Sequence, residues 1–190
     1  MKILCILGSP RKKGNTAKVL GWVEEELRSR ANEVEHLHID DYRLECCAAC
    51  YRCQENPDEL VCSRKDKGVE IFRRMKKADV IIYATPLYCW DFTAQMKPFI
   101  DRHLCLSTGS EKPSTHRSHI ENKKMALLVT AADKAGKGNT DLIEEIFERL
   151  TRFTKSNFIA RLIVPFCTTP DALGKEQLEK ALSFADKIAG

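Results

Sequence analysis

The chain has 190 residues, and its 31 basic side chains against 27 acidic ones leave a formal net charge of only +4. This balance excludes the basic stripe that nucleic acid requires, and the apolar run near the start, residues 3–7, is too short for a secretion signal or a membrane span. We therefore expect a cytoplasmic protein of a single domain, residues 1–190, without nucleic-acid or membrane partners.

Apolar runs and helical faces alternate along the chain. Nearly continuous apolar runs predict buried strands at residues 2–7, 34–39, 80–84, 125–130 and 158–164. Apolar residues at helical spacing predict helices whose faces span 20–31, 69–75, 92–104, 142–150 and 178–188. We expect Asn15 or Thr16 to cap the first helix, and Pro98 to delay or bend the third. This pattern predicts an α/β fold with a doubly wound, five-stranded parallel sheet in the flavodoxin-like order 2-1-3-4-5.

The loop after the first strand, GSPRKKGNT at residues 8–16, has the composition of an anion site. It offers hydroxyls at Ser9 and Thr16, the cation Arg11, and Gly14 for a tight backbone at a helix start. Free helix amides attract phosphate, although a capped turn with a solvated basic run explains the same residues. The loop matches neither the triphosphate fingerprint GxxxxGK[ST] nor the dinucleotide fingerprint GxGxxG.

Two further loops end at the same edge of the predicted sheet, where ligands bind in such folds. The loop at residues 85–92 carries Tyr88 and Trp90, which suit a flat ring but equally a core or an interface. The loop at residues 130–140 has small residues that let a ligand approach the backbone.

Five of the nine cysteines lie within residues 45–62, at positions Cys46, Cys47, Cys50, Cys53 and Cys62. A reducing cytosol disfavours disulfides, which leaves an iron–sulfur cluster, a zinc site or free thiols. A cubane iron–sulfur cluster is ligated by four thiolates, and a CxxCxxC loop can wrap around one corner of it. Structural zinc more often uses two separate knuckles. A redox dithiol needs only a single CxxC. The residue chemistry favours the cluster without excluding the other two.

The remaining cysteines and a histidine pair have simpler interpretations. Cys5, Cys105 and Cys167 are expected to be small buried or half-buried hydrophobes, and Cys89 lies in the aromatic loop without an evident activating group. The histidines form an HxxH, His116 and His119, in the polar loop 107–122, where we expect solvent exposure rather than metal binding.

Two stretches, GSPRKKGNT and ADVIIYATPLYCWDFTAQMKPFIDR, together resemble the NAD(P)H-dependent FMN reductase family over essentially the whole chain. The resemblance implies a flavodoxin-like fold with bound FMN and a structural acid–base pair at Asp101 and Arg102. The implied FMN-binding residues are Ser9, Arg11, Gly14, Asn15 and Thr16 at the phosphate, Pro86, Leu87, Tyr88 and Trp90 around the ring, and Ala131 and Ala132 at the pyrimidine edge. It implies no catalytic acid, base or nucleophile.

The cysteine segment resembles that of one subgroup, the iron–sulfur flavoproteins. The resemblance implies a cysteine-rich insertion after the second strand that holds a [4Fe–4S] cluster through Cys47, Cys50, Cys53 and Cys62. The gap before Cys62 is longer than the subgroup's compact motif usually has, so Cys46 is the alternative fourth ligand.

These features predict a redox flavoprotein that passes electrons between a [4Fe–4S] cluster and FMN. One alternative is an NAD(P)H-dependent FMN or quinone reductase with structural, zinc-binding or free cysteines, and another is a non-enzymatic flavodoxin-like carrier. The electron donor or acceptor stays open among NAD(P)H, ferredoxin and quinone. We expect a homodimer or larger homo-oligomer, because the loop 107–122 and the cysteine segment project beyond a minimal fold.

Overall fold

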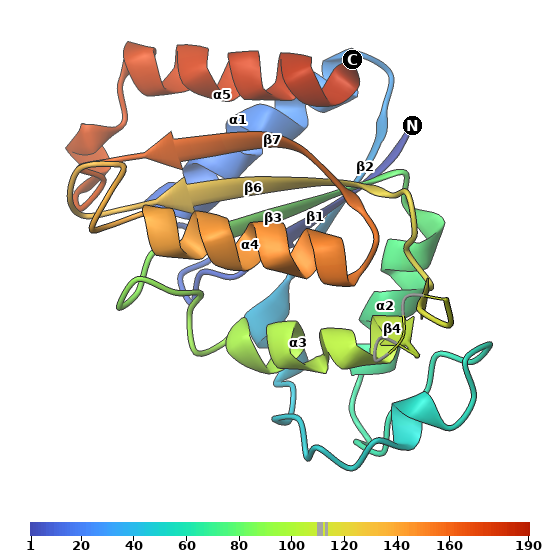
Figure 1. Cartoon of the computed structure of the whole chain (residues 1–190). Helices are drawn as coiled ribbons and strands as arrows, with labels where there is room; N and C mark the ends of the chain where they lie inside the picture. The colour runs from blue at the N-terminus through green and yellow to red at the C-terminus, as the bar shows by residue number, and fades with distance from the viewer. Residues whose placement is uncertain (110–111, 113) are drawn as a thin grey trace.

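The computed structural model describes residues 1–109, 112 and 114–190. Its centre is a five-stranded parallel sheet in the order β2-β1-β3-β6-β7 (Figure 1). The strands are β1 (Lys2–Leu7), β2 (Glu33–His38), β3 (Val80–Pro86), β6 (Lys124–Thr130) and β7 (Asn157–Val164). Counted among themselves, these strands have the predicted flavodoxin-like order, so the fold prediction is confirmed.

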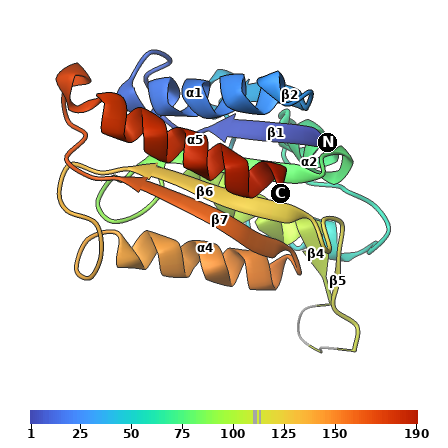
Figure 2. The same ribbon diagram turned by 90° about the horizontal axis from the view of Figure 1, so that it is seen from above.

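Helices cover both faces of this sheet, as Figure 2 shows from above. Alternate residues of β1 point to opposite faces: Ile3 packs in the layer with α1 (Asn15–Ser29) and α5 (Lys175–Ala189), while Leu4 packs in the other layer. That second layer contains α2 (Gly68–Lys77), α3 (Lys97–Asp101) and α4 (Asp141–Phe153). The three central strands, β1, β3 and β6, read as continuous apolar runs because both of their faces are buried, whereas the edge strand β2 is largely exposed.

Short elements join these layers. The 3₁₀ turns are η1 (Ile39–Tyr42), η2 (Arg52–Gln54), η3 (Arg102–Leu106) and η4 (Pro170–Ala172). The polar loop 107–122 carries an antiparallel ribbon of β4 (Ser107–Thr108) and β5 (Arg117–Ser118), and its residues 110, 111 and 113 lie outside the described part of the chain. Of the helices in the described residues, none is long and apolar enough to cross a membrane.

The first helix ends earlier than predicted, and the third begins late, as Pro98 predicted. Ala31 was predicted on the first helix face, but α1 ends at Ser29 and Ala31 takes a left-handed conformation with φ of 59°. The third helix begins only at Lys97, so Phe92 and Met96 pack into the core from a turn before it. The late start was predicted from Pro98, which sits in the first helical turn, where its missing N–H costs no hydrogen bond.

Candidate functional site

The loop between β1 and α1 ends in an open helix N-terminus. Gly14 is the N-cap, with extended backbone and no side-chain hydrogen bond to the helix, so the predicted caps Asn15 and Thr16 are instead the first two helical residues. The first-turn amides therefore have no side-chain acceptor in place, and this arrangement is typical of a site that binds an anion.

The Ser9 side chain fixes the backbone of this loop. Its buried hydroxyl accepts a hydrogen bond from the Arg11 amide at 3.1 Å and donates one to the Arg11 carbonyl at 3.3 Å. A Cβ at Gly14 would lie 3.2 Å from the Cβ of Arg11, so glycine allows the turn to close tightly. The Arg11 side chain is exposed, and its guanidinium is free to reach a bound phosphate.

His38 supports the same loop and was missed by the sequence analysis. Its Nε2 lies 2.7 Å from the carbonyl oxygen of Ser9, and because a carbonyl only accepts, Nε2 carries the proton. On its other side, Nδ1 lies 3.3 Å from Asp41, whose pKa is lowered chiefly by its hydrogen bond with Lys12. The available signal was register: His38 ends β2 directly opposite Leu7, the last residue of β1.

The side chains of Asn15 and Thr16 brace neighbouring loops rather than pointing to the anion site. Asn15 donates from Nδ2 to the Thr169 carbonyl at 2.8 Å. The buried Thr16 hydroxyl lies 2.7 Å from that of Thr130 at the end of β6. These two residues can therefore offer backbone amides to a phosphate, while their side chains fix α1 against the loops after β6 and β7.

The loop after β3 presents its aromatic residues to solvent. Tyr88 and Asp91 exchange backbone hydrogen bonds of 3.1 Å, which closes a tight turn. Inside it, Cys89 and Trp90 both have positive φ, a conformation that costs a non-glycine residue about 1 kcal/mol or more. The turn leaves Tyr88 43% and Trp90 54% exposed, so both rings are available to a ligand or partner.

Three hydrogen bonds hold the loops together. Thr93 Oγ1 donates to the Gly8 carbonyl at 2.5 Å, which joins the aromatic loop to the first loop. The Leu87 amide donates to the Thr130 carbonyl at 2.8 Å, and the Ala131 amide donates to the Val164 carbonyl at 2.9 Å. The structure thus brings all predicted flavin residues to one edge of the sheet, with Pro86 and Ala131 buried and Ala132 exposed.

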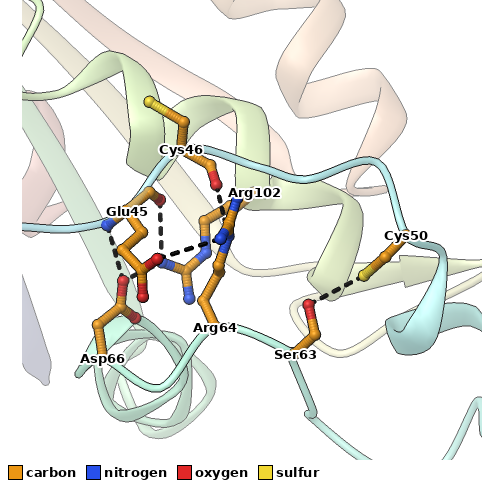
Figure 3. Close-up of polar contacts among 7 residues, drawn as sticks. All are labelled: Glu45, Cys46, Cys50, Ser63, Arg64, Asp66 and Arg102. Carbon is orange, nitrogen blue, oxygen red and sulfur yellow. Dashed lines mark hydrogen bonds and ion pairs between the residues drawn. The ribbon is translucent and has the colours of Figure 1, made fainter.

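The cysteine segment follows η1 and precedes α2, and polar contacts hold it (Figure 3). The Glu45 amide donates to Asp66 at 2.8 Å, and Arg64 Nε donates to the Cys46 carbonyl at 2.9 Å. All nine cysteines are free thiols; Cys46, Cys47 and Cys50 are exposed, Cys62 is half-buried and Cys53 is buried. In Figure 3 the Cys46 thiol points away from the contact between Cys50 and Ser63.

Cys53 packs against Cys105, a thiol the sequence analysis did not connect with the segment. The side-chain amide of Gln54 donates from Nε2 to the Leu104 and Ser107 carbonyls at 2.8 and 2.9 Å, which fixes η2 against η3. The interaction with Cys105 lowers the pKa of Cys53, against the opposing effect of burial, and raises the pKa of Cys105 itself. Cys105 is buried as predicted, but no sequence spacing relates it to the motif.

Interactions extend from this pair to two more thiols. Cys50 lies 3.0 Å from the Ser63 hydroxyl, and this hydrogen bond lowers the pKa of the Cys50 thiol. The electrostatic interaction of Cys50 with Cys53 acts in the opposite direction. Cys62 interacts with Cys105. Within residues 1–109, 112 and 114–190, no three His, Cys, Asp or Glu side chains converge in a metal-holding arrangement, so the thiols would need to move closer to surround one centre.

Arg102 and Asp101 do not form the predicted acid–base pair with each other. The Arg102 guanidinium, only 1% exposed, pairs with Asp66 at 2.6 Å, while Asp101 on α3 pairs with Lys97. The cause is helical geometry: adjacent residues point in different directions, whereas Lys97 lies one turn before Asp101. Arg102 thereby joins η3 to the end of the cysteine segment.

The histidine pair of the polar loop is half-buried rather than exposed. The ring of His116 lies 6.0 Å from that of Phe153, and burial lowers the pKa of His119. The prediction of solvent exposure is therefore wrong, because the ribbon of β4 and β5 folds the loop back against the end of α4.

The doubly wound sheet, the open N-terminus of α1 and the exposed aromatic turn define a flavodoxin-like protein. The profile of the NADPH-dependent FMN reductase family matches residues 1–180, and the chain belongs to this family. It is therefore an oxidoreductase with FMN as its cofactor, as the sequence predicted.

The chain is similar in sequence to proteins named iron-sulfur flavoproteins. The chain is 35% identical over 191 residues to an iron-sulfur flavoprotein of Archaeoglobus fulgidus, an alignment that covers 100% of this chain and 79% of that protein. An iron-sulfur flavoprotein of Methanosarcina thermophila is 37% identical over 106 residues, which covers 56% of this chain and 54% of the relative.

Solved structures of distant sequence share the fold. An FMN-dependent NADH-azoreductase from Bacillus anthracis, in complex with FMN, superposes with a TM-score of 0.72 at 13% identity and covers 100% of both chains. An NAD(P)H:quinone oxidoreductase from Methanothermobacter marburgensis superposes with a TM-score of 0.70 at 18% identity and covers 97% of this chain and 95% of that one.

Proposed function

We propose that this chain passes electrons between FMN, bound at the three loops, and a [4Fe–4S] cluster held by Cys47, Cys50, Cys53 and Cys62. The observation that carries this proposal is that Cys50 interacts with Cys53, and Cys105 with both Cys53 and Cys62, on a segment that Gln54 and Asp66 hold against η3. The names of the relatives support it, since they are iron-sulfur flavoproteins.

The residues of the three loops fit FMN. The open amides of Asn15 and Thr16, with the Arg11 guanidinium, would bind the phosphate, because a helix N-terminus and a charged fork both favour a dianion. Tyr88 and Trp90 would cover the flat ring and limit its contact with water. Bound there, the flavin supplies the exchange between two-electron and one-electron chemistry.

The donor set of the cysteine segment suits ligation by thiolates. Cys50 and Cys53 both have a lowered pKa, from the Ser63 and Cys105 hydrogen bonds respectively, so both favour the thiolate form that ligation needs. The exposed Cys47 can approach them, because its thiol lies on an irregular loop and accepts only a 3.5 Å hydrogen bond from the Ala49 amide. We keep Cys62 as the fourth ligand, since in Figure 3 the Cys46 thiol points away from Cys50.

Anaerobic purification with iron and sulfide assays tests this proposal. The expected result is about four irons per chain, with loss of iron on substituting serine at any one of the four ligands. The matched control is Cys46→Ser, which should keep its iron. Zinc in place of iron would mean that the segment is a structural zinc site. Absence of both metals after anaerobic reconstitution would contradict the cluster.

NAD(P)H is the proposed electron donor, because the family is named for an NADPH-dependent reaction. Anaerobic mixing of the FMN-loaded protein with NADH or NADPH should bleach the flavin absorbance, with a quinone or a ferredoxin as candidate acceptors afterwards. Failure of both nucleotides to reduce the flavin would leave a carrier that exchanges electrons with a protein partner.

We also propose a homodimer or larger homo-oligomer. The cysteine segment extends beyond α2 and α3 in Figure 1, where a second copy could cover it. Sedimentation at micromolar concentration measures the assembly, and a monomer of 21.6 kDa would contradict it.

A further inference from the structure

The guanidinium of Arg102 is buried with only part of its hydrogen-bonding capacity used. Nη1 donates to Asp66 at 2.6 Å and to the Glu45 carbonyl at 3.3 Å (Figure 3). Nε and Nη2 have no hydrogen-bond partner among the described residues, although the side chain is only 1% exposed. A charged donor left without an acceptor in the interior is costly, so these two nitrogens call for a group that accepts hydrogen bonds.

The surroundings hold the guanidinium in place rather than letting it turn toward water. A Cβ at Gly68, the first residue of α2, would lie 2.7 Å from the guanidinium carbon, so glycine is what leaves room for this side chain. Asp66 is itself fixed, because its carboxylate accepts from the amides of Gly68 at 2.9 Å and Glu45 at 2.8 Å. The two free donors therefore have one stable orientation.

Cys62 is the other group, besides Asp66, that interacts with this guanidinium. Burial by itself lowers the pKa of Arg102, while the hydrogen bond to Asp66 and the interaction with Cys62 raise it. Cys62 in turn interacts with Cys105, which packs on Cys53. The unpartnered donors thus adjoin the thiols of the segment, and thiolate sulfur is an acceptor that a guanidinium can serve.

We propose that Arg102 is a positioning residue for the cluster, whose unpartnered Nε and Nη2 would donate hydrogen bonds to the Cys62 thiolate. This inference rests on the proposed cluster, and it selects Cys62 over Cys46 as the fourth ligand. Reduction adds one negative charge to a cluster, and nearby donors and cations stabilise that charge. Arg102 would therefore raise the reduction potential of a cluster bound beside it.

The test compares Arg102→Met, which removes every donor, with Arg102→Lys, which keeps the charge and the pairing with Asp66. Arg64→Met is the matched control, since Arg64 is a half-buried arginine of the same segment that contacts Cys46 instead. The double variant Asp66→Asn/Arg102→Met removes the carboxylate charge that the single change would leave unpaired. Iron and sulfide content and the midpoint potential, followed by electron paramagnetic resonance, are measured on anaerobically reconstituted protein.

We expect Arg102→Met and the double variant to lower the one-electron reduction equilibrium constant about tenfold, which is about 59 mV. Arg102→Lys should recover part of this shift, and Arg64→Met should leave the potential unchanged. Loss of iron in both Arg102→Met variants, with FMN binding intact and iron restored in Arg102→Lys, also supports the role.

Two results overturn the inference in different ways. A wild-type protein that takes up no iron and sulfide removes the cluster itself and Arg102's role with it. A wild-type cluster whose potential and iron content stay the same in Arg102→Met, or change only in Arg64→Met, removes the role of Arg102 and leaves the proposed function standing.

Discussion

The loop between β1 and α1 and the cysteine segment each follow a strand at the same end of one sheet, yet they are held in different ways. Residues 8–14 form a short turn between β1 and α1 that is closed by Ser9 and Gly14 within the loop itself. Residues 43–67 contain a single 3₁₀ turn and are held by Gln54 and Asp66, whose partners lie on η3. Local backbone geometry shapes the first region, and long-range polar contacts shape the second.

Asp66→Ala should produce the largest effect, because it breaks the contact on which the second region depends. The change leaves the Arg102 charge buried and unpaired and removes the acceptor for two amides, so we expect a loss of about 3–5 kcal/mol in the free energy of unfolding. Urea denaturation measures this loss. A cost below 1 kcal/mol would show that the segment does not depend on the ion pair.

His103 sharpens the comparison, since it lies in η3, the turn that holds the cysteine segment. Burial lowers its pKa to about 4, although Nδ1–H donates to the Phe99 carbonyl at 2.9 Å and the Tyr83 hydroxyl lies 2.7 Å from Nε2. The unfolded chain therefore binds a proton between pH 6.5 and 4 that the folded chain does not, so stability falls with acid in this window and is flat above it.

The expected loss on acidification from pH 6.5 to 4 is about 3 kcal/mol relative to His103→Gln, which has no titrating group. Thermal and urea unfolding across this range would measure both proteins. Parallel pH profiles for the two would contradict the assignment of acid sensitivity to His103.

Arg11→Ala tests the first region at its ligand. Loss of a charged hydrogen bond to the phosphate should weaken FMN binding by about 1–3 kcal/mol, as titration of the apoprotein would measure. Lys13→Ala is the matched control, because Lys13 is an exposed cation of the same loop. Equal effects of the two changes would indicate general electrostatic attraction rather than a contact from Arg11.

Asp41→Ala should have the smallest effect. Its ion pair with Lys12 is exposed, so the change should cost less than about 1 kcal/mol in stability. A larger cost would mean that Asp41 orients His38 against the Ser9 carbonyl, so that the loop after β1 depends on this ion pair as well.

The sequence by itself determined the sheet and the edge at which the flavin residues gather. Continuous apolar runs predicted the strands and their order, and the loops of residues 8–16, 85–92 and 130–140 lie together as expected. These features could be predicted because periodicity and apolar runs are local properties, and a parallel sheet brings the carboxyl ends of its strands to one edge.

Only the tertiary structure decided which side chains serve the sites. Asn15 and Thr16 turn out to brace other loops, His38 to support Ser9, and Cys105 to face Cys53. Arg102 pairs with Asp66 rather than with its neighbour Asp101. Each of these contacts joins segments far apart along the chain, and their partners are set by how helices and turns pack on the sheet, which no local spacing encodes.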